Sequence, residues 1–485
     1  MPKLTDPTLL ASDAFIDGRW RESSTGTRFS VTDPASGEAV AAVADCSADD
    51  AKTAVAAAAA AAPGWGELTA HDRADHLMRW HDLMVEHADD LAAIMTAEQG
   101  KPLAEARGEI MYGAGFVSWF AEEGKRAYGQ VIPSPWDGAR IVVLKQPVGV
   151  AAAVTPWNFP NAMITRKAAP ALAAGCPFIV KPAAETPLSA LALGVLAERA
   201  GIPAGVFNVV PTSSAAAVGG VLTGDERIAK FSFTGSTEIG KILLGQTATT
   251  VKNVSMELGG NAPFLVFDDA DVDAAVVGAV AAKYRNNGQT CVCANRFLVQ
   301  RGIQPAFTAK LAEASAALSV GPGSKPGVDV GPLINPAALA KVEELVGSAV
   351  GAGATLHTGG SLSAAGGLFY QPTVLSGVLP TMEIASAEIF GPVSSIITFD
   401  TEEEAIHLAN DTRFGLAAYF YTNDTKRAWR VAEGLEYGMV GANTGRISTP
   451  VAPFGGWKES GIGREGAQQG LEEYLETKFV AFDIS

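Results

Sequence analysis

The chain has 485 residues, of which 48% are apolar and 18% are charged, a composition typical of a globular protein with more than one hydrophobic core. Its formal net charge of −16 disfavours nonspecific binding to nucleic acid or anionic membranes, so we expect neither as a partner. The four cysteines, Cys46, Cys176, Cys291 and Cys293, follow no disulfide or zinc-ligand spacing, and we expect no metal.

The first residues, "MPKLTDPTLLASDAFIDGRW", lack the basic and then apolar pattern of a signal peptide. No apolar run in the chain reaches the length of a membrane span. We therefore expect a soluble, cytoplasmic protein.

Helical patterns dominate the first hundred residues. Ser47 lies three positions before Asp50 and ahead of an alanine run, which is the pattern of a capping box followed by strong helix formers. Between residues 72 and 99, apolar side chains recur at helical spacing, among them Leu77, Trp80, Met84, Leu91 and Ile94. Both stretches predict helices.

Strand patterns alternate with helical ones from residue 139 on. Predicted strands lie in "ARIVVLKQP", "VGVAAAVTP", "PFIVKPA", "GVFNVV", "IAKFSFTG" and "NAPFLVF". The segment "TPLSALALGVLAERAG" predicts a helix with Thr186 as its cap, Pro187 as its first residue and Gly201 at its end. The alternation predicts an α/β fold with a parallel sheet covered by helices, and a second α/β unit beyond Asp268.

Three side chains suit catalysis. Cys291 follows Gly-Gln-Thr, a tight turn that could aim amide N–H groups at the sulfur, although a cysteine is also a common buried apolar residue. Glu257 ends an apolar strand, where a carboxylate is costly unless it is paired or acts as a base. Asn158 follows a buried strand, and its amide could donate to an oxyanion, although asparagine is also common in turns.

Seven motifs in chain order carry a resemblance to a known family. The segments "TPWNFP", "IVKPA", "FTGSTEIG", "MELGG", "GQTC", "EIFGP" and "APFGGWKESGIGRE" resemble the aldehyde dehydrogenase superfamily, and the likeness runs from "FIDGRW" to the final strand. It implies a Rossmann-like dinucleotide-binding domain (1–125 and 149–258), an α/β catalytic domain (259–465) and a β oligomerisation arm (126–148 and 466–485). A homodimer or homotetramer is expected from the same resemblance.

The resemblance also implies a reaction. Cys291 would attack a small-molecule aldehyde, and the Asn158 amide would hold the resulting oxyanion. Loss of hydride to a nicotinamide would leave a thioester on Cys291. Glu257 would then activate water and release the carboxylic acid.

The cofactor residues are inferred from the same likeness. They are Trp157, Lys181, Gly235, Ser236, Gly240, Glu388 and Phe390. NAD-preferring members often place glutamate three residues after the lysine, where this chain has Ala184 and then Glu185. We therefore expect NADP or NAD to serve, with NADP slightly favoured.

The segments "WNFPNAMITRK" and "RNNGQTCVCANRFLVQ" are similar to succinate semialdehyde dehydrogenases. In that branch two arginines, here Arg166 and Arg285, bind the far carboxylate of the substrate together with a serine, here Ser448. Either arginine alone could equally be a solvated charge. Glutarate semialdehyde is the close competitor, because a methylene discriminates only modestly. Arg446 departs from the branch, where an aliphatic residue is expected, and leaves the exact aldehyde open.

Cys293 matches a position where some members close a disulfide with the nucleophile, which would block the thiolate reversibly. It could equally do no more than pack behind the loop.

Two rival functions for the whole chain are disfavoured. A coenzyme A-acylating enzyme usually lacks the glutamate present here as Glu257, and a non-catalytic scaffold protein would have no reason to keep Cys291, Asn158 and Glu388.

Overall fold

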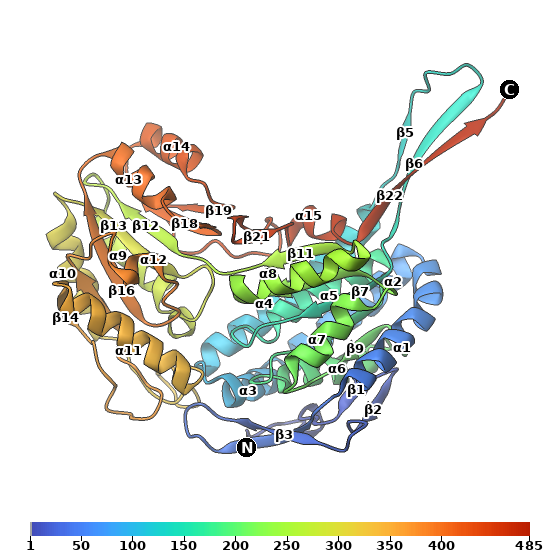
Figure 1. Cartoon of the computed structure of the whole chain (residues 1–485), viewed down its shortest axis with the longest axis horizontal. Coiled ribbons are helices and arrows are strands. Elements are labelled where there is room, and N and C mark those ends of the chain that lie inside the picture. Colours follow the sequence, from blue (N-terminus) through green and yellow to red (C-terminus); the bar gives the residue numbers. More distant parts are fainter. Residues whose placement is uncertain (1) are drawn as a thin grey trace.

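Two large β-sheets organise the chain in the computed structural model, which describes residues 2–485 (Figure 1). The first sheet has eight strands, and its five central strands, from β9 to β11 in spatial order, are parallel. The spatial order is β2 (Arg19–Arg21), β1 (Ala14–Ile16), β9 (Phe207–Val209), β8 (Phe178–Lys181), β7 (Val150–Val154), β10 (Ile228–Thr234), β11 (Asn253–Glu257) and β21 (Gly461–Ile462).

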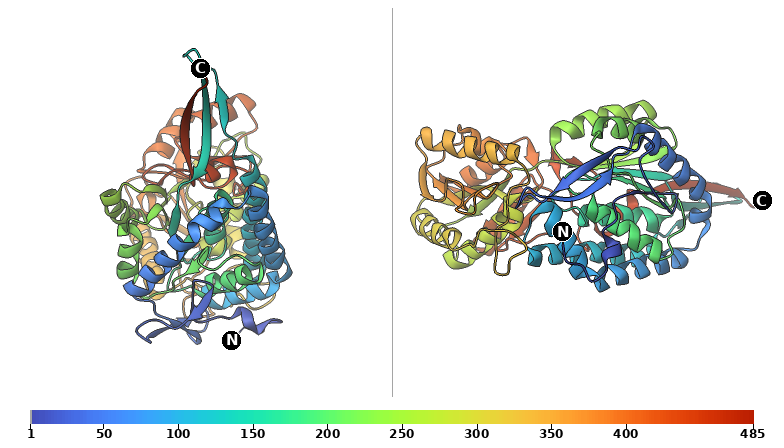
Figure 2. Two further views of the ribbon diagram at one scale, coloured as in Figure 1. Left: turned by 90° about the vertical axis from the view of Figure 1, so that its right-hand side faces the viewer. Right: turned by 90° about the horizontal axis from the view of Figure 1, so that it is seen from below.

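Helices cover both faces of this sheet (Figures 1 and 2). One face packs against α1 (Ala48–Glu67), α7 (Ala215–Gly224) and α8 (Thr237–Thr247). The other packs against α2 (Ala70–Glu86), α3 (Ala88–Gln99), α4 (Leu103–Glu123), α5 (Ala162–Ala174) and α6 (Leu188–Arg199). Alternate residues of β7 lie on the two faces of the sheet. Ala151 and Ala153 belong to one core, and Val150 and Ala152 belong to the other. Burial on both faces explains why these strands are continuously apolar.

The predicted capping box of α1 is confirmed, because Ser47 and Asp50 bond each other's backbone N–H groups. The predicted cap of α6 is wrong. The helix begins at Leu188, and the Glu98 carboxylate accepts the Leu188 and Ser189 N–H groups at 2.7 and 2.8 Å. Glu98 lies on α3, so a rule that reads only the residues next to the helix cannot find it.

The second sheet has seven strands and forms the predicted second α/β unit. In spatial order they are β14 (Thr355–Thr358), β15 (Thr373–Ser376), β16 (Val393–Phe399), β13 (Ala294–Gln300), β12 (Ala262–Val266), β18 (Ala417–Tyr421) and β19 (Met439–Ala442). All are parallel except β14. Its helices are α9 (Val272–Lys283), α10 (Gln304–Ala316), α11 (Pro336–Gly351), α12 (Glu383–Ser386), α13 (Glu402–Asn410) and α14 (Thr425–Gly434).

The first sheet and its helices form the first unit. A three-stranded sheet projects from the body next to it (Figures 1 and 2). It consists of β5 (Gln130–Ile132), β6 (Ala139–Pro147) and β22 (Leu475–Asp483), with β6 in the middle. The short helix α15 (Ala467–Glu472) precedes β22. Leu471 and Tyr474 belong to the core of the first unit and Leu475 packs against it, so the projecting part of β22 lies beyond Leu475.

The remaining elements are short. Two small two-stranded antiparallel sheets pair β3 (Arg28–Thr32) with β4 (Ala39–Ala44), and β17 (Phe414–Gly415) with β20 (Trp457–Lys458). The 3₁₀ turns are η1 (Pro7–Leu9), η2 (Gly124–Arg126), η3 (Ala248–Thr250) and η4 (Arg285–Gly288). Among residues 2–485, no helix is long and apolar enough to cross a membrane.

Candidate active site

The candidate site lies where the two large sheets approach each other. Asn158 follows β7, Lys181 ends β8 and Glu257 ends β11, so the first sheet contributes the carboxyl ends of its parallel strands. Cys291 and Glu388 come shortly before β13 and β16 of the second sheet. Direct contacts join the two sets: the Asn158 amide donates to the Gln289 carbonyl at 2.9 Å, and the Gly260 N–H donates to Glu388 at 2.9 Å.

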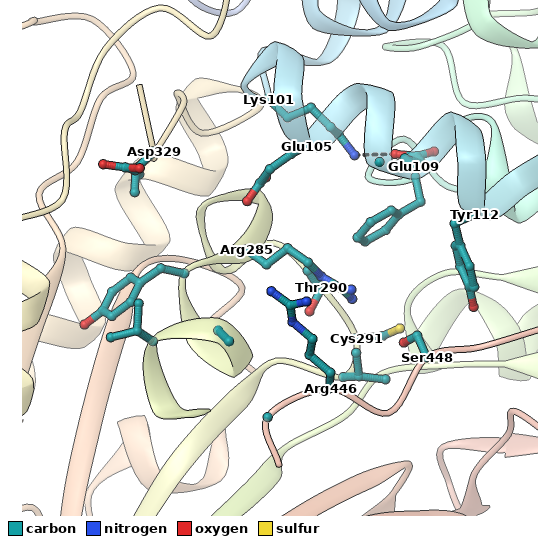
Figure 3. A pocket seen from close by; sticks show the side chains of 18 of the residues that line it. Lys101, Glu105, Glu109, Tyr112, Arg285, Thr290, Cys291, Asp329, Arg446 and Ser448 are labelled. Atoms are coloured by element: carbon teal, nitrogen blue, oxygen red, sulfur yellow. Dashed lines mark hydrogen bonds and ion pairs between the residues drawn. The ribbon is translucent and has the colours of Figure 1, made fainter. Parts of the chain in front are cut away.

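A cavity of about 500 Å³ opens beside Cys291 (Figure 3). Its apolar part includes Tyr112, Phe159, Met163 and Phe454. Its polar and charged part includes Lys101, Glu105, Glu109, Arg166, Arg285, Thr290, Asp329, Arg446 and Ser448. A mixed apolar and charged cavity of this size fits a small aldehyde that carries an ionised group.

The backbone before Cys291 is tightly folded. Asn286 and Asn287 both adopt left-handed φ angles, +52° and +57°, which asparagine tolerates better than most residues. A side chain on Gly288 is excluded, because its Cβ would lie 2.2 Å from the Gly391 carbonyl oxygen. This folding places Cys291 half-buried at the cavity wall.

The Cys291 thiol is protonated at neutral pH in the free protein. Burial raises its pKa to about 12, and the nearby Arg166 charge opposes this rise. Because the thiolate is the nucleophile, the group needs a base or a bound positive charge before it can attack.

Glu257 is a buried carboxylate at the end of β11. It is 2% exposed, and neither of its oxygens has a hydrogen-bond partner among the described residues. Burial, and then the charge of Glu465, raise the pKa of Glu257 well above its usual value. A buried carboxyl whose pKa is raised is a stronger base than an ordinary carboxylate, which suits it to general base catalysis.

Asn158 is held from several sides. Its carbonyl accepts hydrogen bonds from Lys101 at 2.7 Å and from the Asn286 amide at 2.9 Å. Its own side-chain amide donates one hydrogen to the Gln289 carbonyl, next to the loop that carries Cys291. The second amide hydrogen remains available for an oxyanion formed near the sulfur.

The two arginines expected to bind a carboxylate differ in their surroundings. Arg166 is 1% exposed, forms an ion pair with Glu465 and lies over the Phe454 ring at 4.1 Å, so it is not a solvated helix charge. Arg285 is exposed to the cavity and lies over the Phe159 ring at 5.3 Å. Within residues 2–485, Arg285 forms no ion pair, which leaves its guanidinium free for a ligand.

The residues expected to hold a dinucleotide fit that group. The Lys181 ammonium is buried and bonds only the Pro182 carbonyl, at 3.0 Å, among the described residues, so donors remain for ribose hydroxyls. Ser236 caps the N-terminus of α8, a place where backbone N–H groups favour phosphate. Gly240 packs tightly, since its Cβ would lie 2.3 Å from Leu258.

The remaining cofactor candidates lie beside them. The Gly235 N–H donates to the Glu257 carbonyl at 3.0 Å, which joins the turn after β10 to β11. The Trp157 and Phe390 rings meet edge to face at 5.6 Å. Burial raises the pKa of Glu388 to about 7, so this carboxyl changes its charge near neutral pH.

Cys293 is buried, and its thiol donates to the Lys283 carbonyl at 3.0 Å. All four cysteines are free thiols. A disulfide between Cys291 and Cys293 would require Cys293 to leave this bond, so the redox role stays a prediction.

Two buried ion pairs at the site could not be predicted from the sequence. Lys101 pairs with Glu109, and Lys167 pairs with Glu465, which also contacts Arg166. Lys167 and Glu465 are 298 positions apart, so no local pattern could show that they meet. These pairs fix α4 and α5 beside the cavity.

Comparisons with known proteins agree with this architecture. The model of the aldehyde dehydrogenase family matches residues 20–480. The chain is 56% identical to 3-sulfolactaldehyde dehydrogenase of Pseudomonas putida (99% of each chain covered), 56% to glutarate-semialdehyde dehydrogenase of Pseudomonas aeruginosa (99% of each) and 55% to the NADP(+) succinate-semialdehyde dehydrogenase GabD of Escherichia coli (99% of this chain, 100% of the other). The structure of an aldehyde dehydrogenase from Brucella melitensis matches with a TM-score of 0.99 at 57% identity over 100% of both chains.

The fold and these relatives define an enzyme of the oxidoreductase class. The chain belongs to the aldehyde dehydrogenase family, and the predicted fold is confirmed.

Proposed function

We propose that this enzyme oxidises an aldehyde with an acidic group at its far end, most simply succinate semialdehyde to succinate, with NADP or NAD as the oxidant. The observation that carries the proposal is the free Arg285 guanidinium in the cavity that contains Cys291. A guanidinium binds a carboxylate through two parallel hydrogen bonds. The relatives are named for succinate semialdehyde, glutarate semialdehyde and sulfolactaldehyde, which are all acidic aldehydes.

In the first step the Cys291 sulfur attacks the aldehyde carbon and forms a thiohemiacetal. The charge that develops on the carbonyl oxygen is stabilised by the Asn158 amide and the Cys291 N–H, an effect of about 3 to 4 kcal/mol in other enzymes. A nicotinamide held by the residues named below would supply the acceptor for the hydride that leaves this carbon. A thioester then remains on Cys291.

In the second step Glu257 takes a proton from water, which attacks the thioester carbon. The carboxylic acid is released and the Cys291 thiol is restored. The raised pKa of Glu257 makes it a stronger base than an ordinary carboxylate. The proton of the Cys291 thiol passes to solvent in the first step, so Glu257 is unprotonated when it takes the proton of water in the second step.

Arg285 and Ser448 bind the far carboxylate in this proposal. Arg166, which is paired with Glu465, supports the site by its charge at the cavity wall and lowers the pKa of Cys291. Glutarate semialdehyde is the second candidate, because a 56% identical relative is named for it and a methylene changes binding only modestly.

Lys181, Glu388, Trp157, Phe390 and the turn of Gly235, Ser236 and Gly240 would hold the dinucleotide. Ala184 presents no carboxylate that would repel a 2′-phosphate, so NADP is slightly favoured, as in the relative named for NADP(+).

The projecting sheet would serve as the oligomerisation arm, beside a dinucleotide-binding and a catalytic domain. Its strand β22 lies at an edge of the sheet and exposes Phe479 and Phe482. An edge strand with exposed aromatic side chains can pair with another chain. We therefore expect it to join a neighbouring copy in a homodimer or homotetramer.

Steady-state formation of reduced nicotinamide tests the proposal. Succinate semialdehyde, glutarate semialdehyde and uncharged butanal would each be assayed with NAD and with NADP. We expect a strong preference for the two acidic aldehydes. Equal use of butanal would contradict the role of Arg285, and no turnover of any aldehyde would contradict the proposed function.

A further inference from the structure

Arg446 is a second free cation in the cavity, and the proposed reaction gives it no role. It lies on the loop after β19 and is exposed to the cavity. Across residues 2–485, its guanidinium forms neither an ion pair nor a hydrogen bond. Figure 3 shows the Arg446 and Arg285 side chains extending from different segments into the same space in front of Thr290, with Cys291 and Ser448 beside them.

The backbone on both sides of Arg446 is fixed. Gly445 lies directly against α9, since a Cβ on Gly445 would be 2.2 Å from the Gly278 carbonyl oxygen. On the other side, Ile447 packs against the core of the second unit. The Arg446 N–H also donates to the Thr444 hydroxyl at 3.2 Å. A residue held between two anchored neighbours keeps its side chain at the cavity.

The other charges around the cavity already have partners in the protein. Its remaining cations are in ion pairs, namely Lys101–Glu109 and Arg166–Glu465. The Glu105 and Asp329 carboxylates accept the backbone N–H groups of Asn286 (2.8 Å) and Ser319 (2.9 Å). Only Arg285 and Arg446 are left as cations without ion-pair partners among the described lining residues. Two such guanidinium groups repel each other until an anion lies between them.

The number and directions of the acceptor oxygens influence which anion suits two guanidinium groups. A carboxylate has two oxygens in one plane, and one arginine can bind both. A sulfonate has three oxygens around a tetrahedral sulfur, so it can accept from donors that approach from two directions. The arrangement of Arg285 and Arg446 therefore suits a sulfonate better than a single arginine would.

We propose that Arg285 and Arg446 form a paired anion subsite that lets the enzyme oxidise aldehydes ending in a sulfonate, with Arg446 setting the preference between sulfonate and carboxylate. The inference rests on the proposed function, because it assigns the far end of the same substrate. The chemistry at Cys291 is unchanged.

A matched pair of substrates isolates this effect. Succinate semialdehyde and 3-sulfopropanal differ only in their acidic group, and each would be assayed with wild-type enzyme, Arg446→Leu and Arg446→Lys. We expect Arg446→Leu to lower kcat/KM for 3-sulfopropanal about tenfold more than for succinate semialdehyde, mainly through KM, since charge-assisted hydrogen bonds to an exposed arginine are lost. Arg446→Lys keeps the positive charge but lacks the paired N–H donors of a guanidinium group, so it should restore part of the kcat/KM that Arg446→Leu loses. Arg285→Leu, the control, should impair both substrates.

An equal loss on both substrates would mean that Arg446 only attracts anions in general, and no loss on either would mean that it points away from the substrate; both results overturn the proposal. Calorimetric titration of 3-sulfopropanoate and succinate into wild-type enzyme and Arg446→Leu measures the same preference without turnover. If the wild-type enzyme oxidised no aldehyde, the proposed function would fail. A sulfonate affinity that falls in Arg446→Leu would still support the paired subsite.

Discussion

The two large sheets contribute to the site from opposite ends of their strands. In the first sheet, Asn158, Lys181 and Glu257 lie at or just beyond the carboxyl ends of parallel strands. In the second sheet, Cys291 and Glu388 precede β13 and β16, so the amino ends of those strands face the site. The contact between Gly288 and the Gly391 carbonyl ties these two approach segments together.

The two units contribute different kinds of groups to the site. The strand ends of the first sheet carry the Asn158 amide, the proposed base Glu257 and the Lys181 ammonium group, which are all buried. Hydrogen bonds with Lys101 and Gln289 hold Asn158 in place. Loops of the second unit supply the half-buried thiol and the free arginines that face the cavity. The first unit therefore provides buried polar groups, and the second provides the proposed nucleophile and the arginines proposed to select the substrate.

Removing the proposed nucleophile of the second unit should have the largest effect. Cys291→Ala should lower kcat by roughly 10⁴-fold or more, the range seen when nucleophiles of other covalent catalysts are removed. Fluorescence titration with NADP should show that cofactor binding is retained, because the proposed cofactor contacts lie elsewhere. Turnover close to the wild-type value would remove Cys291 from the mechanism.

Replacing Glu257, the proposed general base at the end of β11, should have the next largest effect. Glu257→Gln keeps the shape but cannot take a proton, so hydrolysis of the thioester should slow by about 10² to 10⁴-fold. Stopped-flow assays should then show a burst of reduced cofactor followed by slow turnover. A uniformly slow reaction without a burst would instead place the role of Glu257 before hydride transfer.

Arg285 tests the assignment of substrate selection to the second unit. Arg285→Leu should reduce kcat/KM for succinate semialdehyde by about 10- to 100-fold, the effect expected when a hydrogen-bonded ion pair is lost. Butanal, which has no anionic group, serves as the control and should be nearly unaffected. If both aldehydes lost activity equally, Arg285 would act by holding the loop before Cys291.

Replacing Glu388 should give the smallest effect, and this effect should depend on pH. Its carboxylate form is the better acceptor for ribose hydroxyls, and its pKa is about 7 because of burial. NADP affinity of the free enzyme should therefore rise as the pH increases through 7. Glu388→Gln should weaken NADP binding about fivefold, the effect of one hydrogen bond, and should remove this pH dependence; a pH profile identical to wild type would argue against the contact.

The contribution of the first sheet could be predicted from the sequence more directly than that of the second. Asn158 and Glu257 could be found because ligands bind at the carboxyl ends of parallel strands, and those strands are visible as apolar runs. Cys291 lies before its strand, where this rule does not apply. Its Gly-Gln-Thr turn alone leaves open whether it is a nucleophile or a buried apolar residue, and only the family resemblance favours the nucleophile. The alternation of strands and helices predicted two α/β units, but it placed "NAPFLVF" with the first one, whereas this strand is β12 of the second sheet.

What could not be predicted depends on contacts between distant segments. The Glu98 carboxylate caps α6 from another helix, and Glu465 meets Arg166 and Lys167 across most of the chain. In the sequence, Arg166 and Arg285 carry equal weight as ligands of a carboxylate. Only the structure separates the buried, paired arginine from the free one, because burial and pairing are tertiary properties.

The most direct test of the account is mass spectrometry of an acyl-enzyme. Glu257→Gln would be mixed with succinate semialdehyde and NADP, quenched in acid and digested. The account predicts a single succinyl group on the peptide that contains Cys291, and none when NADP is omitted. Reduced cofactor formed without that adduct, or with the adduct on another cysteine, would contradict the assignment of Cys291 as the nucleophile.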